Sequence, residues 1–197
     1  MLVLLIVVLV VAGVALYLLV RKKDEPVAAA GPVDPFADKD SDALRGDPRA
    51  LKAGDIVDIF GETFTVRGSL RLKEGGYQWS EHLLDTAEGT RKWLSVEEDP
   101  DLELVLWTET PGVAAAGGNE LEHDGKRFRL DESGSARYLS EATTGLTPSG
   151  TVAYHDYVAD DGTRLSFEDF GESGKKEAAI GQVLYRSAIM IYPQSSS

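Results

Sequence analysis

The sequence predicts an all-β domain, an antiparallel sandwich or barrel built from two similar halves, preceded by one transmembrane helix. Three observations predict this architecture. Beyond Leu51, apolar and polar residues alternate with the period of two that is typical of half-buried strands, and glycine-containing turns separate the alternating runs. A short motif that begins at Gly89 is nearly repeated at Gly162. An uncharged apolar run opens the chain.

The apolar run extends from Leu2 to Val20 and contains no charged residue. As a helix it would be about 28 Å long, close to the hydrocarbon thickness of a bilayer. Arg21, Lys22 and Lys23 follow the run, and no Lys or Arg precedes it. The positive-inside rule therefore predicts a single-pass protein of the cell membrane, with residues 1–20 as the anchor, the N-terminus outside and the C-terminal domain in the cytoplasm.

A cleaved signal peptide is the alternative interpretation, with Ala28 to Ala30 as a small-residue cleavage site. A signal peptide carries its positive charges before a shorter apolar run, so the order of charges favours the anchor. Residues 21–50 are rich in Pro, Ala and Asp and have no apolar period, which predicts a disordered acidic tether.

Residues 51–110 and 121–193 are the two expected β halves, with 111–120 as linker and 194–197 as tail. In each strand the apolar residues share one face, because successive side chains of a strand alternate between faces. The pairs and triplets expected on one face are Phe64 with Val66, Leu102 with Leu104 and Leu106, Phe128 with Leu130, and Ile189 with Ile191. The only stretches that could form short helices after residue 50 are 138–145 and 175–184.

The repeated motif reads GTRKWLSVEE at 89–98 and GTRLSFED at 162–169. Aligning the two copies places Glu97 with Glu168, and nearby segments place Glu81 with Asp156. The same alignment sets Phe64 over Phe128, Val66 over Leu130 and Arg91 over Arg164. A duplicated hairpin unit explains this echo, because half a sheet cannot cover its own apolar face and a second copy can.

Composition excludes several kinds of chemistry. The formal net charge is −13, which disfavours contact with the phosphate backbone of nucleic acids. The chain has no Cys, so disulfides, thiolate metal sites and a Cys nucleophile are excluded. Phosphate-binding and nucleophile-elbow motifs are also absent. We expect no catalytic residue, no metal and no cofactor.

Ser80, His82 and Asp85 have the residue types of a hydrolytic triad, but Asp85 lies on the opposite face of the expected strand from Ser80 and His82. His82, His123 and His155 match no metal-binding signature. Because Glu81-His82 and His155-Asp156 recur at near-equivalent places, a site assembled between the halves is conceivable. A surface His beside a carboxylate is the commoner arrangement.

Aromatic and acidic residues together suggest a ligand or partner contact. The candidates are Tyr77, Trp79, Trp93, Glu97 and Glu168. Their carboxylates and aromatic faces would suit a small cation or a polyamine. The alternative is structural: Trp79 and Trp93 would pack in the core, and the two glutamates would accept hydrogen bonds from Arg91 and Arg164 across a hairpin.

The segments LKAGDIVDIFGETFTVRGSLRL, YQWSEHLLD, RKWLSVEED, LSFED and IMIYP resemble a bacterial family of domains of unknown function, DUF4178, from about Leu51 to Pro193. The resemblance implies an all-β domain, often membrane-tethered, with no established reaction and no catalytic residues to transfer. Members of that family look like neighbours of membrane-linked polyamine aminopropyltransferases. We therefore expect a non-enzymatic binding or scaffold module for a membrane-associated protein complex. The alternative is a regulatory domain that binds a small cation or polyamine and acts with a polyamine-synthesising membrane enzyme.

Overall fold

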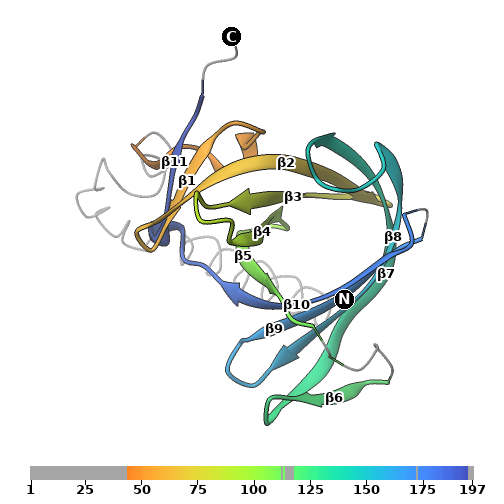
Figure 1. Ribbon diagram of the computed structural model, residues 1–197. Helices are drawn as coiled ribbons and strands as arrows, with labels where there is room; N and C mark the ends of the chain where they lie inside the picture. The colour runs from red at the N-terminus through yellow and green to blue at the C-terminus, as the bar shows by residue number, and fades with distance from the viewer. Residues whose placement is uncertain (1–43, 112, 114–117, 172, 195–197) are drawn as a thin grey trace, which may run out of the picture. The chain divides into compact units, whose positions relative to one another are not determined.

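The body of the chain is an antiparallel β-barrel of eight strands with additional strands on its outside. A computed structural model describes residues 44–111, 113, 118–171 and 173–194. Figure 1 shows the long strands curving around a central space, with β1 and β11 lying beside β2. The all-β prediction is confirmed, and the sheet closes as a barrel rather than as two stacked layers.

All the strands pair antiparallel with their neighbours. Their bounds are β1 Ile56–Ile59, β2 Glu62–Glu74, β3 Tyr77–Asp85, β4 Arg91–Glu98, β5 Leu102–Glu109, β6 Glu120–His123, β7 Lys126–Ala142, β8 Ser149–Ala159, β9 Arg164–Phe170, β10 Lys175–Val183 and β11 Ile189–Tyr192. Two single-turn 3-10 helices, η2 (Pro48–Ala50) and η3 (Arg186–Ala188), lie before β1 and before β11.

The order of strands is β11-β1-β2-β3-β4-β5-β10-β9-β8-β7-β6, and a further pairing of β2 with β7 closes the ring. Closure brings the backbones very close at Gly68, whose partner on β7 is Ala142. A Cβ atom at Gly68 would lie 2.6 Å from the backbone of Thr143, so only glycine fits there. Gly68 also follows the β-bulge after Val66, which helps β2 to bend.

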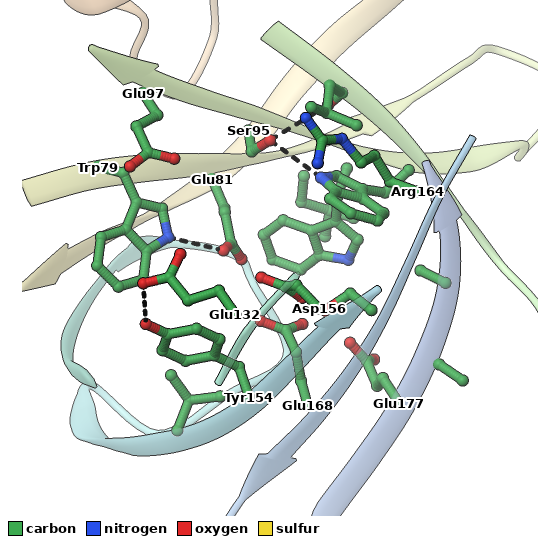
Figure 2. Close-up of a pocket in the computed structure, with 18 of the residues that line it drawn as sticks. Trp79, Glu81, Ser95, Glu97, Glu132, Tyr154, Asp156, Arg164, Glu168 and Glu177 are labelled. Carbon is green, nitrogen blue, oxygen red and sulfur yellow. Dashed lines mark hydrogen bonds between the residues drawn. The ribbon is translucent and has the colours of Figure 1, made fainter. Parts of the chain in front are cut away.

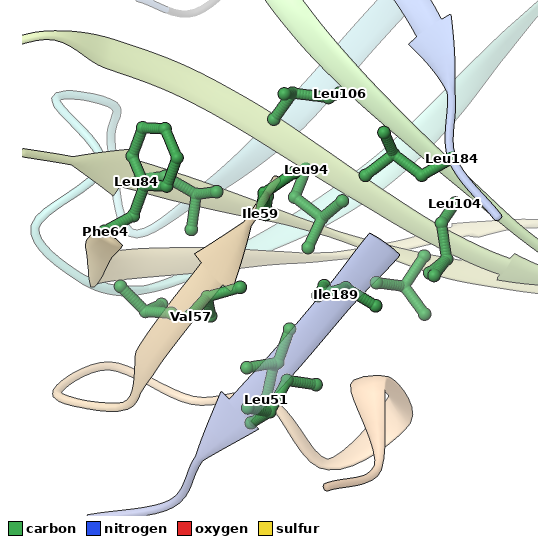
Figure 3. Close-up of a cluster of buried hydrophobic side chains, with 13 residues drawn as sticks. Leu51, Val57, Ile59, Phe64, Leu84, Leu94, Leu104, Leu106, Leu184 and Ile189 are labelled. Atoms are coloured by element: carbon green, nitrogen blue, oxygen red, sulfur yellow. The ribbon is translucent and has the colours of Figure 1, made fainter. Parts of the chain in front are cut away.

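The principal apolar core lies on the outer face of the barrel wall made by β3, β4 and β5 (Figure 3). Leu84, Leu94 and Leu104 project outward from these three strands and are fully or almost fully buried. They pack against Val57 of β1 and Ile189 of β11. The β1–β11 pair thus covers the wall as a second layer, and its apolar alternation agrees with the predicted strand faces.

The opposite wall has its own outer cluster. Phe128 of β7, Tyr157 of β8 and Leu165 of β9 are buried there, and Leu121 of β6 packs against them. Tyr157 and Phe167 meet edge to face, with ring centroids 5.8 Å apart. A third cluster, around Leu70, Tyr138 and Phe170, lies on the inner face of the barrel, because Leu70 is the cross-strand partner of the cavity residue Glu81. The rest of the inner face carries more polar side chains.

Several local geometries recur at the aligned positions of the two halves. The β1–β2 turn has positive φ at Phe60 and Gly61, and the β6–β7 turn has it at Asp124 and Gly125. The five-residue turns before β4 and β9, residues 86–90 and 159–163, also match. Their backbone hydrogen bonds are Thr86 N to Thr90 O and Gly89 N to Thr86 O in the first turn, and Ala159 N to Thr163 O and Gly162 N to Ala159 O in the second. These matches agree with the alignment of Gly89 with Gly162, and duplication stays a prediction.

The two possible short helices are wrong. Residues 138–142 continue β7, and residues 175–183 form β10, because both segments find a hydrogen-bonding partner strand on each side. Within the described part of the chain, no helix is long and apolar enough to cross a membrane. The predicted anchor, 1–20, and residues 21–43 of the predicted tether lie outside the described residues. The last residues of that tether, 44–50, are ordered, since Pro48–Ala50 form η2 and Arg49 pairs with Glu98 of β4.

Candidate functional site

The barrel encloses a cavity of about 760 Å³. Alternation along each strand decides which side chains reach it. On β3, Trp79, Glu81 and Leu83 line the cavity, whereas the intervening Ser80 and His82 are buried on the outer side. The same rule holds around the ring, because cross-strand partners share a face.

Acidic side chains outnumber basic ones on the lining. The acidic residues are Glu74, Glu81, Glu97, Asp99, Glu103, Glu109, Asp131, Glu132, Asp156, Glu168 and Glu177. The basic residues are Arg91, Lys92, Arg164 and Lys175. A cavity with this balance has a strongly negative potential, because water is partly excluded and the charges are poorly screened.

Aromatic side chains form part of the wall. The indole Nε1 of Trp79 donates a hydrogen bond to Glu81 Oε1 at 3.1 Å, and the Trp79 ring meets Tyr154 edge to face, with centroids 6.0 Å apart. Trp93 of β4 is the cross-strand partner of Trp107 of β5. The Trp107 ring lies so close to the backbone of β10 that a Cβ atom at Gly181 would come within 2.6 Å of it.

Two of the cationic groups that line the cavity, Arg164 and Lys175, have acidic partners there. Arg164 of β9 donates to Asp131 Oδ2 at 2.7 Å and to Glu103 Oε2 at 3.2 Å, so it joins β7 to β5. Lys175 forms an ion pair with Glu177.

The hydroxyl of Tyr154 lies within hydrogen-bonding distance of two carboxylates. The Tyr154 hydroxyl donates to Glu74 Oε2 at 2.6 Å and lies 3.2 Å from Glu132 Oε1. Burial, together with these two carboxylates, raises the pKa of Tyr154, so its hydroxyl stays protonated and remains a donor.

Glu81, Asp156 and Glu168 form an inner carboxylate cluster, which Figure 2 shows with the three side chains directed toward one another from β3, β8 and β9. Burial raises the pKa of Glu81 to about 7, with Asp156 and Glu177 adding smaller repulsions. Burial likewise raises the pKa of Asp156 to about 6. The pKa of Glu168 is raised well above its usual range by burial and by repulsion from Glu81.

Glu97 lies on β4 and is the cross-strand partner of Trp79. Burial raises its pKa, and the nearby carboxylates of Glu132 and Glu103 act in the same direction. The cavity therefore contains several carboxyl groups that ionise less readily than they would in water, for lack of enough positive charge beside them.

The structure brings all five sequence-predicted contact residues, Tyr77, Trp79, Trp93, Glu97 and Glu168, to the lining of this one cavity. Tyr77 and Glu97 are exposed at the rim, Tyr77 at 62%, and the other three are partly buried. The predicted hairpin contacts of the two glutamates are wrong for Arg164, whose hydrogen bonds go to Asp131 and Glu103. Trp79 and Trp93 are both cavity residues and packing residues, since they also lie against the cluster around Leu70 and Tyr138.

Sequence reasoning missed Glu81, Asp156, Tyr154 and Arg164 as members of the site. The repeat contained a usable signal, because it aligned Glu81 with Asp156 and both side chains face the cavity. Their inward direction depends on strand register and on the bulge between Leu130 and Glu132. Periodicity alone does not give that register.

The histidines do not build a catalytic or metal site in the described residues. His82 is fully buried outside the cavity, where its Nδ1 and the Ser69 hydroxyl are 2.8 Å apart. Asp85 lies on the other face of β3, as predicted from the spacing. Among residues 44–194, apart from the gaps given above, no group of three or more His, Cys, Asp or Glu has a metal-holding arrangement.

Comparison with known proteins gives a family match and relatives. The family model described as "Domain of unknown function (DUF4178)" matches residues 52–186. "Uncharacterized protein Rv2597" of Mycobacterium tuberculosis and "Uncharacterized protein Mb2628" of Mycobacterium bovis are each 35% identical over 191 residues, which covers 93% of this chain and 91% of theirs. No solved structure matches significantly.

Proposed function

Since the chain belongs to the DUF4178 family, whose description assigns no activity, we propose from the cavity that the barrel is a non-enzymatic binding domain for a small organic cation. The observation that carries the proposal is the inner cluster of Glu81, Asp156 and Glu168. No basic side chain of the described residues forms an ion pair with any of these three. A cationic ligand would supply the missing positive charge.

The size and the walls of the cavity support the same ligand class. A volume of about 760 Å³ is within the range of small-molecule sites. Trp79, Trp93 and Trp107 offer indole surfaces beside the carboxylates, and aromatic faces attract cations. Glucose-like neutral ligands would leave the carboxylates without counter-charge, so a cation is favoured.

A polyamine such as spermidine belongs to this ligand class and suits a cavity with acidic groups beyond the inner cluster. Glu97 and Glu132 are such a pair, because the carboxylate of Glu132 contributes to the raised pKa of Glu97. Binding would then report cation concentration to a partner protein, which is a regulatory role.

Isothermal titration of the full-length protein in detergent with spermidine tests the proposal. We expect saturable binding that is weakened at least about tenfold by Glu81→Gln, because one charged hydrogen bond is worth about 1.5–3 kcal/mol. Glu122→Gln is the matched control, because Glu122 is exposed on β6 and removes the same charge away from the cavity. Equal weakening in both variants, or no saturable binding of any organic cation, would contradict a cavity site.

The apolar run at residues 2–20 supports a second part of the proposal, attachment of the barrel to the cell membrane with its body in the cytoplasm. Attachment would raise the effective concentration of the barrel near membrane proteins. A protease added to intact cells is expected to leave the barrel uncut. Release of the barrel into the medium would contradict this orientation.

Exposed aromatic residues support contact with a membrane-associated partner. Phe60 is 64% exposed and Tyr185 is 83% exposed. Both adjoin Ala188, because Phe60 N donates to Ala188 O and Ala188 N donates to Tyr185 O. A photo-crosslinker at Tyr185 is expected to capture a membrane protein that the same crosslinker at Glu122 does not. Identical products from the two positions would contradict a specific contact.

A further inference from the structure

We propose that the cationic group taken by the cavity is a protonated primary or secondary amine, whose N–H groups donate hydrogen bonds to Glu81, Asp156 and Glu168. This inference rests on the proposed function and names the chemical class of the ligand. It excludes quaternary ammonium groups as the preferred ligands.

Asp156 has an oxygen atom without a partner. Its Oδ1 is buried and has no hydrogen bond from any described residue. Its carboxyl group lies beside Ser166, its cross-strand partner on β9, which is the neighbour that favours its ionised form. A buried acceptor without a donor costs about 1–3 kcal/mol, so the site is incomplete as it stands.

Glu81 and Glu168 also have carboxylate oxygen atoms without a hydrogen-bond donor. Glu81 accepts one hydrogen bond, from the Trp79 indole, which leaves its second oxygen free for another donor. Glu168 accepts none from the described part of the chain, and its cross-strand partner is another carboxylate, Glu177. Carboxylates are acceptors only, so three of them placed together need protons or an external N–H donor among them.

Two of the four basic side chains that line the cavity, Arg164 and Lys175, form ion pairs with carboxylates outside the inner cluster. Arg164 directs its two terminal nitrogens to Asp131 and Glu103, and Lys175 pairs with Glu177. Neither one forms a hydrogen bond to the inner cluster. In the empty cavity these carboxyl groups therefore depend on their own protons, and a ligand N–H group would replace those protons as the donor.

The number of N–H groups separates the possible ligands. A primary ammonium has three donors, which matches the three carboxylates around the space. A quaternary ammonium has the same charge but no donor, so it would leave the same oxygen atoms unsatisfied. Sites built to hydrogen-bond a ligand group discriminate strongly against analogues that lack it. Aromatic cages with few carboxylates would show the opposite preference.

The test compares n-butylammonium with butyltrimethylammonium by isothermal titration of the full-length protein at pH 8. The two ligands share the same charge and chain length. We expect n-butylammonium to bind at least about tenfold more tightly, from the cost of a buried acceptor left without a donor. Asp156→Asn and Glu168→Gln are expected to reduce this preference, and Glu122→Gln is expected to retain it.

Equal affinities, or tighter binding of butyltrimethylammonium, would overturn the inference and leave a cation-binding barrel intact. Failure of both ligands and of spermidine to bind would overturn the inference together with the proposed function. The comparison of ligands on the unmodified protein does not depend on the folding of any variant.

Discussion

Glu168 of β9 and Glu177 of β10 are direct cross-strand partners that face the same cavity. Like charges in this position are destabilising, and only Glu177 has a cationic partner, Lys175. Apolar clusters lie outside both walls of the barrel and in one part of its interior, and the rest of the cavity has more acidic than basic side chains.

Stability should fall as pH rises toward and through neutrality. The pKa of Glu81 is raised by burial to about 7, with Asp156, Glu168 and Glu177 facing it from β8, β9 and β10. A raised carboxyl pKa contributes stability that is present below the unfolded value and lost as pH rises through the folded value. Between pH 6.5 and 8 we expect the free energy of unfolding to fall by about 1 kcal/mol. Urea unfolding at each pH measures the free energy of unfolding.

Glu81→Gln should flatten that dependence, because the amide does not titrate. His82 has the opposite effect only at lower pH: burial lowers its pKa to about 3, so its contribution is complete above about pH 6.5 and is lost in acid. A slope between pH 6.5 and 8 that is unchanged in Glu81→Gln would show that the inner cluster does not ionise in this range.

Cation binding should release protons. A positive ligand stabilises the ionised forms of Glu81 and Glu168, both of which have raised pKa values in the empty cavity. At pH 7 we expect about one proton released for each ligand bound. Titrations in phosphate and in HEPES, whose ionisation enthalpies differ and neither of which is a primary or secondary amine, measure that number. Heats that are independent of the buffer would contradict the exchange of protons for the ligand.

Arg164→Gln should strengthen cation binding while weakening the fold slightly. The substitution removes a positive charge from the cavity and breaks the contacts with Asp131 and Glu103. Since these groups are partly exposed, we expect a loss of only about 1 kcal/mol in the free energy of unfolding. Affinity for n-butylammonium is the measurement. Weaker binding would indicate that Arg164 holds the ligand rather than competing with it.

Ser69→Ala should destabilise the barrel without changing ligand affinity. The Ser69 hydroxyl is the one hydrogen-bond partner of the buried His82 ring in the described residues, since His82 Nε2 has none. Loss of a buried partner costs about 1–3 kcal/mol. Urea unfolding at pH 8 is the measurement, with exposed Ser149→Ala as the control, which should change stability by less than about 0.5 kcal/mol.

The sequence predicted strand identity and the buried faces well, because alternation is a local property. Phe64 and Val66 are buried together, as are Ile189 and Ile191. The sequence did not predict closure of the sheet into a barrel, because the pairing of β2 with β7 joins residues such as Gly68 and Ala142 that are distant in the chain. Residues 138–142 and 175–183 read as possible helices for a related reason: only the neighbouring strands determine their conformation.

The site was predictable in part. Trp79, Glu97 and Glu168 were recognisable as aromatic and acidic residues at repeated positions, and all three reach the cavity. The repeat aligns Asp156 with Glu81, but alternation alone does not tell whether the side chain of Asp156 or that of His155 faces inward. Only the register of β8 against β9 shows that Asp156 faces inward with Ser166.

The central claim is that a cationic amine occupies the barrel between the inner carboxylates. Crystals of the protein soaked with 3-bromopropylammonium test it directly, because bromine can be located by its anomalous scattering. The account predicts a bromine peak inside the cavity, with the ammonium nitrogen in hydrogen-bonding distance of Glu81 and Glu168. A cavity without bromine in crystals soaked at saturating concentration would contradict it.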